Sequence, residues 1–487
     1  MTASVMLGMF LAAIEATAVA AAVPTAVGEM GGVERYSWVF SAYLLTSTTT
    51  VPLYGKLADL YGRKRIYQIS VGLFMLGSAL SGLAQSIEQL ILFRALQGIG
   101  AGGVMPVAIT MTGDIFTLEE RARFQWLFSG VWAVASLAGP LLGGWITDAL
   151  SWRWIFFLCI PFGIASALVL QLFFRESTER RQHGLDILGT VSLTAAVTLL
   201  LLGTIEGPGA WGWTDPRTIA MFVGAAAALA VFFWQERRAP EPMLPLDLFK
   251  NRVIAVSSFG NTLVGILLFS LTAYVPMFAQ GVQGGTATDA GKLLTPILIG
   301  WPISSTLGGR IMLRVGYRKM AIMGAVMLIA GGALLATIDA DTSRLVIATS
   351  MFIIGFGLGF TSMPYMLGPQ NAVPWGLRGV ATSSVQFFRT MGGAICVAAL
   401  GALLNARLEA RVGPGVSPNT LLDPALRVRT SPETLATLTA GLLDGLQAIY
   451  LVLAVIAAVG LVIAFFVPRG TPEAHTYRRD EVPEIAP

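Results

Sequence analysis

Histidine, cysteine and charged residues are all scarce in this 487-residue sequence. It holds two histidines and two cysteines, and Asp, Glu, Lys and Arg together make up only 12% of it. The histidines, His183 and His475, stand alone, and the cysteines, Cys159 and Cys396, lie far apart inside apolar stretches. Because metal sites and disulfide frameworks need clustered or regularly spaced ligands, the sequence predicts neither.

Catalytic and nucleotide-binding motifs are also missing. We find no grouping of Ser, His and Asp for nucleophilic catalysis, no Gly-rich loop to cradle a phosphate, and no polar stretch long enough to form a soluble domain. An enzyme and an ATP-driven pump are therefore disfavoured, and no cofactor is expected.

Apolar residues, by contrast, are in excess: they make up 55% of the sequence and raise its mean hydropathy to +0.70. A soluble domain of this length would not tolerate that composition. Apolar runs of about 18 to 25 residues recur along the chain, each long enough to cross a hydrocarbon core of about 30 Å as a helix. The sequence therefore predicts an all-α integral membrane protein that has the lipid bilayer as its surroundings.

The apolar runs predict about fourteen transmembrane helices. They lie near 4–26, 37–56, 68–87, 89–113, 124–147, 153–174, 187–205, 217–234, 253–279, 289–313, 319–337, 345–368, 380–405 and 443–467. The first run has no basic segment before it and no small-residue cleavage site after it, so we read it as a retained helix rather than a signal peptide.

Lys and Arg are distributed unequally between the predicted loops. If the N-terminus is cytoplasmic, the cytoplasmic loops collect about twenty of these residues, against about eight on the opposite side. Because positive charge favours the cytoplasmic side and the number of helices is even, both termini are expected in the cytoplasm. This bias accounts for the net charge of +4 without a nucleic-acid partner. The loop residues include Lys56, Arg63, Lys64, Arg65, Arg237, Arg238, Arg318 and Lys319.

Three short motifs recur at a nearly constant separation of about 252 to 257 residues. GKLADLYGRKR from Gly55 is repeated as GRIMLRVGYRK from Gly309, VPTAV as VPMFA, and GIGAGG as GFGLGF. Paired six-helix halves around a midplane cavity are typical of secondary transporters. We assign the chain to an N-terminal half at 1–186, two inserted linker helices at 187–250, a C-terminal half at 251–467 with an external loop at 406–441, and a cytoplasmic tail at 468–487.

These motifs resemble those of a known family. GKLADLYGRKR is similar to the loop signature of the major facilitator superfamily, and LFRALQGIGAGG resembles its Arg-Gln-Gly motif. SLAGPLLGG resembles the superfamily's antiporter motif through Gly139, Pro140, Gly143 and Gly144, and the first helix resembles that of the fourteen-helix drug:proton antiporter branch. The resemblance covers essentially the whole chain. It implies the facilitator fold and proton-driven export, with an acidic residue usual at the position of Glu15.

Glu15 is a lone carboxylate in the middle of the first apolar run, within LAAIEATAVAA. Its helical neighbours offer no partner, and a charge at mid-bilayer costs about 2.5 to 3.5 kcal/mol, so Glu15 must face the bundle interior or a water-filled cavity. There it is able to hold a proton in one state and release it in another, as proton coupling requires. The alternative is a permanently protonated structural glutamate, a role that glutamine would serve without the cost of ionisation.

Arg94, in the fourth predicted helix, is a second intramembrane charge, with Gln97 on the same helix face. Because an arginine does not lose its proton there, it needs a carboxylate, carbonyls or water nearby, and its field modulates a titrating partner. We therefore assign Glu15 and Arg94 to proton coupling. The alternative for Arg94 is a side chain that extends to the interface. Arg389, in VQFFRTMGG, is a further buried cation, in a segment that resembles one typical of the fourteen-helix branch.

The loop signature carries a separate set of residues. Gly55 and Gly62 are expected to permit close helix approach and a tight turn, and Asp59 lies one helical turn before Arg63. In the superfamily the matching Asp and Arg are implicated, with an Asp at the cytoplasmic end of the fourth helix, in a charge network that latches the two halves. The resemblance places that third residue at Asp114. Anchoring by positive charge alone would explain the basic residues but not Asp59.

Substrate contact is expected from residues near the predicted cavity. Aromatic and methionine side chains can receive a flat lipophilic cation by stacking and cation–π contact, although such residues are more often part of the core. The candidates are Trp38, Tyr43, Gln97, Phe387, Phe388, Arg389 and Met391. The small residues of the antiporter motif permit tight helix contact, and only the resemblance connects them to antiport.

Together these features predict a secondary antiporter that exports hydrophobic, cationic compounds across the bacterial inner membrane in exchange for protons. Its partners are expected to be the bilayer, small lipophilic substrates and protons; no protein partner is identified, and the proton gradient replaces a cofactor as the source of energy. Export of a dedicated lipid or metabolite by the same machinery is the alternative within this class. A non-transporting receptor or scaffold is disfavoured because it has no use for a titrating midplane carboxylate.

Overall fold

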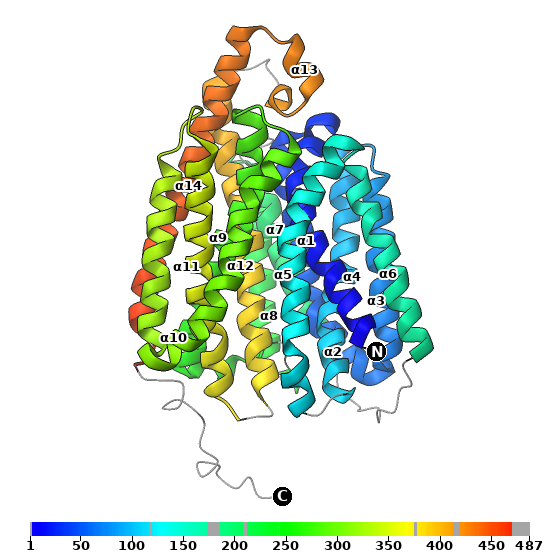
Figure 1. Cartoon of the computed structure of the whole chain (residues 1–487). Coiled ribbons are helices and arrows are strands. Elements are labelled where there is room, and N and C mark those ends of the chain that lie inside the picture. The colour runs from blue at the N-terminus through cyan, green and yellow to red at the C-terminus, as the bar shows by residue number, and fades with distance from the viewer. Residues whose placement is uncertain are drawn as a thin grey trace, which may run out of the picture.

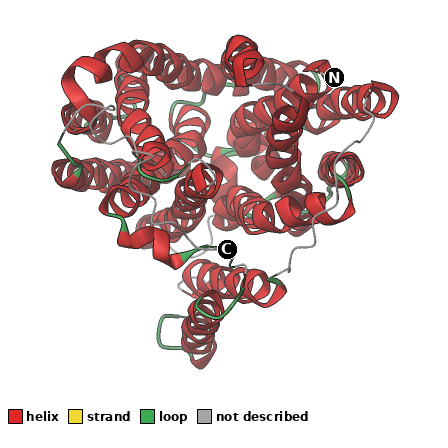
Figure 2. Ribbon diagram, turned by 90° about the horizontal axis from the view of Figure 1, so that it is seen from below, coloured by secondary structure: helices red, strands yellow, loops and turns green. Residues whose placement is uncertain are grey.

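The computed structural model describes residues 2–115, 118–173, 186–207, 212–240, 242, 244–374, 377–412 and 418–469. Within these ranges every regular element is a helix, and Figure 2 shows the bundle from one end. The predicted all-α fold is therefore confirmed. Ten helices in the described part of the chain are long and apolar enough to cross a membrane. The count of fourteen spans stays a prediction.

The N-terminal half contributes six long helices that run back and forth along the bundle (Figure 1). They follow the apolar runs because a backbone in lipid must satisfy its own hydrogen bonds, which a helix does within one segment. The six are α1 (Thr2–Met30), α2 (Tyr36–Tyr61), α3 (Arg63–Gly82), α4 (Ile87–Ile115), α5 (Leu118–Ala149) and α6 (Arg153–Phe173).

Two linker helices and the helices of the C-terminal half follow along the chain. The linker helices are α7 (Ile187–Glu206) and α8 (Pro216–Glu236). The C-terminal half contains α9 (Arg252–Met277) with a π-helical turn η4 (Phe278–Val282), α10 (Ala287–Ala336), α11 (Arg344–Asn371), α12 (Arg378–Val412) and α14 (Pro432–Phe466). Short elements join them: η1 (Val33–Arg35), η3 (Leu246–Lys250), η6 (Pro418–Leu421) and α13 (Pro424–Arg429).

The long element α10 consists of two helices joined at Gly316. This glycine has φ 83° and ψ 169°, outside the helical range, so the chain turns there. Gly62, between α2 and α3, has φ 97° and ψ 139°. The two glycines occupy matching places in the two copies of the loop motif, and both adopt a positive φ that a side chain disfavours. The repeat read from the sequence therefore has a counterpart in the backbone.

Figure 1 defines two ends of the bundle. α1 begins at the lower end, whereas α13 and the first turns of α14 project beyond the bundle at the upper end. The sequence predicts one long loop at 406–441, but α12 continues to Val412 and α14 begins at Pro432. Those boundaries were wrong because an apolar run marks only the part of a helix that lies in lipid, and both helices continue beyond it.

The two halves meet along two helix pairs, α5 with α10 and α2 with α12. α1 also contacts α9 and α10 across the boundary. The largest cluster of buried apolar side chains crosses it as well, and includes Ala18 and Val23 of α1 together with Leu293 of α10. Apolar packing therefore holds the halves together around α1, the helix that carries Glu15.

The linker helices α7 and α8 pack against each other beside the two halves. Only 17% of the most apolar stretch of α8 is buried within the protein, against 72% for α9, so α8 turns most of its apolar surface outward, to the side where lipid lies. α7 differs, because its Val197 and Leu201 pack with Trp38 of α2 and Ala398 of α12. α7 therefore covers a seam between the halves instead of only filling lipid-facing space.

Candidate functional site

Glu15, in the middle of α1, is completely buried and forms an ion pair with Arg94 of α4. Arg94 is itself only 3% exposed. The alternative of an arginine that extends out to the interface is therefore wrong. Each charge alone would be costly at this depth, and the pair is tolerated because each ion neutralises the other.

Arg94 also has neutral partners. Its Nη1 donates to Oε1 of Gln97 at 2.7 Å, and its Nε donates to the carbonyl oxygen of Val39 at 3.3 Å. Its guanidinium carbon lies 4.2 Å from the centre of the Tyr43 ring. Because these partners carry no charge, Arg94 keeps two acceptors and a cation–π contact whether or not Glu15 is ionised.

Two polar atoms at this site have no hydrogen-bond partner among the described residues. They are Oε2 of Glu15 and Nε2 of Gln97, both on fully buried side chains. An unpartnered buried polar atom costs about 1 to 3 kcal/mol. A group that forms a hydrogen bond with either atom removes this cost, so the site favours the binding of a proton, a water molecule or a polar ligand group. We call Glu15, Arg94, Gln97 and Tyr43 the charge cluster; it combines a fixed cation with a titratable carboxyl.

The antiporter-like motif of α5 packs directly on α1. A Cβ on Gly139 would overlap the hydroxyl of Thr17, and one on Gly143 would overlap the carbonyl oxygen of Ala18. The Thr17 hydroxyl also donates a hydrogen bond to a backbone carbonyl of α5 at 3.1 Å. Thr17 lies two residues after Glu15, so the motif fixes the helix that carries the carboxyl through the close contact that small residues permit.

The same motif reaches across to the C-terminal half. A Cβ on Gly144 would overlap the backbone of Ala287 on α10. In the opposite direction, a Cβ on Gly291 of α10 would overlap the carbonyl oxygen of Pro140. α5 is therefore wedged between α1 and α10, and any movement of one half against the other must change these contacts.

Hydrogen bonds also join the halves toward the upper end. Gln280, in the π-helical turn after α9, donates to the carbonyl oxygen of Ala21 at 2.9 Å and accepts from Thr25 at 2.8 Å. Ser41 of α2 donates to the carbonyl oxygen of Ala394 on α12 at 3.0 Å. The two halves are thus closed against each other at the upper end.

The loop signature folds differently from the sequence expectation. α2 ends and α3 begins on either side of Gly62, so Asp59 and Arg63 lie on different helices and not one turn apart on the same helix. Gly62 makes the expected tight turn, with φ 97°. The expected close helix approach at Gly55 is absent among the described atoms, none of which would lie within 4 Å of a Cβ there. The side chains of Asp59 and Asp114 lie outside the described residues.

The residues expected to line a cavity fall into separate groups. Tyr43 and Gln97 belong to the charge cluster. Four others form or flank an apolar cluster between α2, α7 and α12: Trp38, Phe387, Phe388 and Met391. These four are part of the core, which is the alternative the sequence left open for them.

Arg389 of α12 is an intramembrane cation of the C-terminal half. Its guanidinium carbon lies 5.2 Å from the centre of the Trp301 ring on α10, and its Nε has no hydrogen-bond partner in the part of the chain that the structure describes. Its backbone packs against Gly265 of α9, where a Cβ would overlap the Arg389 carbonyl oxygen. The backbone of α12 is therefore held close to α9 at this cation, and the buried Nε keeps a donor that no described group uses.

The fold and the charge cluster define a class of protein: a multi-pass helical membrane protein whose two halves surround buried charges, as in secondary transporters. The family model for the Major Facilitator Superfamily matches residues 5–397, and the chain belongs to this superfamily. The resemblance seen in its motifs is therefore confirmed.

Relatives of this chain include proteins named as multidrug transporters. It is 39% identical over 404 residues to the multidrug transporter protein MdtP of Bacillus subtilis, a match that covers 82% of this chain and 74% of that protein. It is 35% identical over 396 residues to multidrug resistance protein 3 of the same species, with coverage of 81% and 77%. A solved inward-facing, unoccupied bacterial homologue of the human lysosomal transporter Spinster has a TM-score of 0.69 at 15% identity, with 98% of each chain covered. That likeness concerns the fold alone.

Proposed function

We propose that this chain is an antiporter that exports hydrophobic, cationic compounds out of the bacterial cell across its inner membrane in exchange for protons. In this proposal both termini lie in the cytoplasm, so the lower end in Figure 1 is cytoplasmic and the halves are closed toward the outside. The distribution of Lys and Arg supports this orientation. The multidrug relatives support export of drug-like substrates.

The charge cluster is the observation that carries the proposal. Protonation of Glu15 removes one member of a buried ion pair, while Arg94 keeps its bonds to Gln97 and to the Val39 carbonyl. A cationic substrate competes with the proton, and with Arg94, for the same carboxylate. Because each ligand then weakens the binding of the other, and linkage makes this effect reciprocal, the site is suited to exchange and not to cotransport.

The proton gradient is sufficient to drive this exchange. One proton that moves inward through about 100 mV releases roughly 2.3 kcal/mol, which supports about a fifty-fold uphill gradient of a neutral substrate. A one-for-one exchange of a proton for a monovalent cation moves no net charge, so the pH difference alone drives it and supports about a tenfold gradient for each pH unit. No nucleotide-hydrolysing part of the protein is then required. The proton, the substrate and the bilayer are the partners in this scheme, and no cofactor takes part.

Proteoliposomes with an imposed pH gradient test the coupling. With tetraphenylphosphonium as the probe cation, we expect uphill transport when the gradient is present and none after an ionophore dissipates it. Uphill transport that persists without the gradient would contradict proton coupling.

Replacement of Glu15 tests the site itself. Glu15→Gln keeps an oxygen that accepts from Arg94, so the protein should fold, but it removes the titrating group. Affinity for the cation should rise with pH in the native protein, because a higher pH deprotonates the carboxyl, and should be independent of pH in Glu15→Gln. Glu29→Gln, at the half-exposed upper end of the same helix, is the matched control and should transport normally. Native uphill pumping by Glu15→Gln would make Glu15 a structural residue.

Arg389 favours a second candidate substrate class. A cation whose Nε is unpartnered suits a substrate that carries an acidic group, as in export of a dedicated lipid or metabolite. A panel that includes lipophilic cations, anions and zwitterions distinguishes the two classes. Transport of none of them, at any gradient, would favour a receptor or scaffold.

A further inference from the structure

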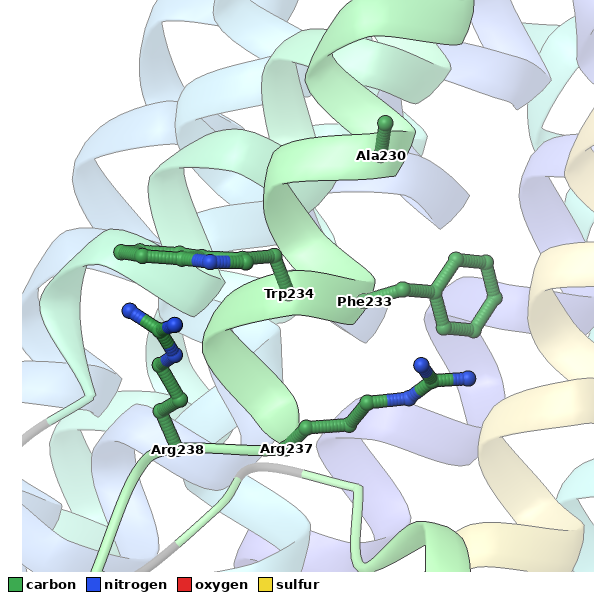
Figure 3. Close-up of a pocket in the computed structure, with 5 residues that line it drawn as sticks. All are labelled: Ala230, Phe233, Trp234, Arg237 and Arg238. Atoms are coloured by element: carbon green, nitrogen blue, oxygen red, sulfur yellow. The ribbon is translucent and has the colours of Figure 1, made fainter.

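A groove of about 630 Å³ lies at the lower end of α8, on the linker and far along the chain from the charge cluster. Figure 3 shows that Arg237 extends beneath Phe233 and Arg238 beneath Trp234, so two cations flank the helix below two aromatic rings. The guanidinium carbon of Arg238 lies 4.4 Å from the centre of the Trp234 ring.

The two arginines have no ion-pair partner within the described part of the chain. The adjacent carboxylate, Glu236, is only 4% exposed and accepts a hydrogen bond from the backbone N–H of Leu244 at 2.9 Å. Arg237 and Arg238 are both exposed. The groove therefore presents two positive charges that the described part of the chain leaves without a counter-ion.

The length of α8 fixes the depth of these charges in a membrane. Its 21 residues rise about 31 Å, which matches a hydrocarbon core of about 30 Å. Tryptophans mark both ends of this span: Trp234 in its last turn and Trp213 shortly before its first, as is typical of residues at a membrane interface. Arg237 and Arg238 directly follow the span, so they lie at the level of the lipid phosphates.

The surface above the two charges is apolar and faces lipid. Ala230 lies one turn before the two rings and lines the groove, and its small side chain leaves space between Phe233 and Trp234. Both rings are exposed, at 43% and 50%. A ligand whose anionic group binds the guanidinium groups can therefore place an apolar part against the surface formed by Ala230 and the two rings.

We propose that Arg237 and Arg238 bind the phosphate headgroup of an anionic phospholipid, with an acyl chain lying along Ala230 between Phe233 and Trp234. Guanidinium groups hold phosphate through paired, charge-assisted hydrogen bonds, and basic pockets beside transmembrane helices suit anionic headgroups. A soluble phosphate would use the charges but not the apolar surface. The site is independent of the substrate and of the proton, so its test does not depend on the proposed transport function.

Lipid titration of the purified full-length protein tests this site. Native mass spectrometry in detergent micelles measures binding of phosphatidylglycerol, with phosphatidylcholine as the zwitterionic comparison. We expect the native protein to prefer phosphatidylglycerol, and Arg237→Gln/Arg238→Gln to bind it about thirtyfold more weakly, the equivalent of about 1 kcal/mol for each arginine. Arg237→Lys/Arg238→Lys should lie between the two, because lysine keeps the charge but not the bidentate geometry.

Arg217→Gln is the matched control, because Arg217 is an exposed arginine at the opposite end of the same helix. Its affinity for phosphatidylglycerol should equal that of the native protein. Equal binding of both lipids by the native protein would overturn the proposal without any variant. Native affinity in the double glutamine variant, or displacement of the lipid by millimolar inorganic phosphate, would overturn it as well.

Discussion

Asp148, near the end of α5, accepts hydrogen bonds from the backbone N–H groups of Ala287 at 3.0 Å and Thr288 at 2.8 Å, at the start of α10. A carboxylate at this position satisfies amides that the helix leaves unpaired and interacts favourably with the positive end of its dipole. Because Asp148 belongs to the N-terminal half and α10 to the C-terminal half, this cap exists only while the halves are closed at the upper end.

Asp148→Ala should therefore shift the protein away from the closed arrangement. An N-cap contributes about 1 kcal/mol, so the ratio of closed to open protein should fall about fivefold. Distances between spin labels on Gln85 and Asp341, exposed residues at the upper end of the two halves, measure this ratio. Asp215→Ala removes a cap that lies wholly within α8 and should leave the distance distribution unchanged. An identical distribution in Asp148→Ala would show that the cap does not hold the halves together.

Gly143→Ala should destabilise the protein because the new methyl group overlaps the backbone of Ala18, which cannot rotate away. Overpacking of this kind costs about 1 to 3 kcal/mol. The thermal midpoint can be followed by the reaction of a thiol dye with Cys159, which is buried and free in the native protein. Gly72→Ala on α3 is the control, since its methyl group would meet no described atom within 4 Å. If both variants unfold at the same temperature, the contact between α5 and α1 is looser than described.

The fold could be predicted from the sequence because each membrane helix appears as a run of apolar residues within its own segment. The apolar runs were sufficient to predict the helices. The two copies of the loop motif, with Gly62 and Gly316 at matching places, were sufficient to predict the internal repeat. Local composition did not indicate that α12 and α14 continue outside the bilayer, since a helix in water needs no apolar run. The packing of α7 onto α2 and α12 depends on tertiary contacts, which no single segment encodes.

The candidate site was predictable residue by residue but not as an arrangement. Glu15 and Arg94 were both recognisable because an isolated charge in lipid is costly, yet their pairing depends on how α1 packs against α4. Asp148 and Gln280 were missed because polar residues near helix ends are common, and the backbone groups they bind lie in the other half. Trp38, placed in the cavity by its chemistry, lies in the core instead.

Asp59→Asn should slow transport more than it weakens substrate binding. Asp59 lies in the last turn of α2 at the lower end, whereas the charge cluster lies deep in the bundle. A change there acts on the movement of the halves and not on the site. Efflux rate and equilibrium binding of tetraphenylphosphonium, measured on the same preparation, separate the two effects. Arg65→Gln, an exposed neighbour on α3, should change neither, and equal losses of affinity and turnover in Asp59→Asn would exclude a latch.

The last prediction concerns the ion pair between Glu15 and Arg94. Arg94→Gln leaves Glu15 buried without its cation, and loss of one partner of a buried pair costs about 3 to 5 kcal/mol, so the amount of folded protein should fall. In Glu15→Gln/Arg94→Gln no charge remains, and two amides can bond to each other, so the folded amount should recover.

Size-exclusion profiles of the single and double variants at equal expression measure this recovery as a double-mutant cycle. We expect non-additive effects, with the double variant close to Glu15→Gln and well above Arg94→Gln. Strictly additive losses would mean that the two residues do not depend on each other. The recovered double variant should still fail to pump against a gradient, because its fold is restored while its titrating carboxyl is not. Uphill transport by that variant would place proton coupling elsewhere in the bundle.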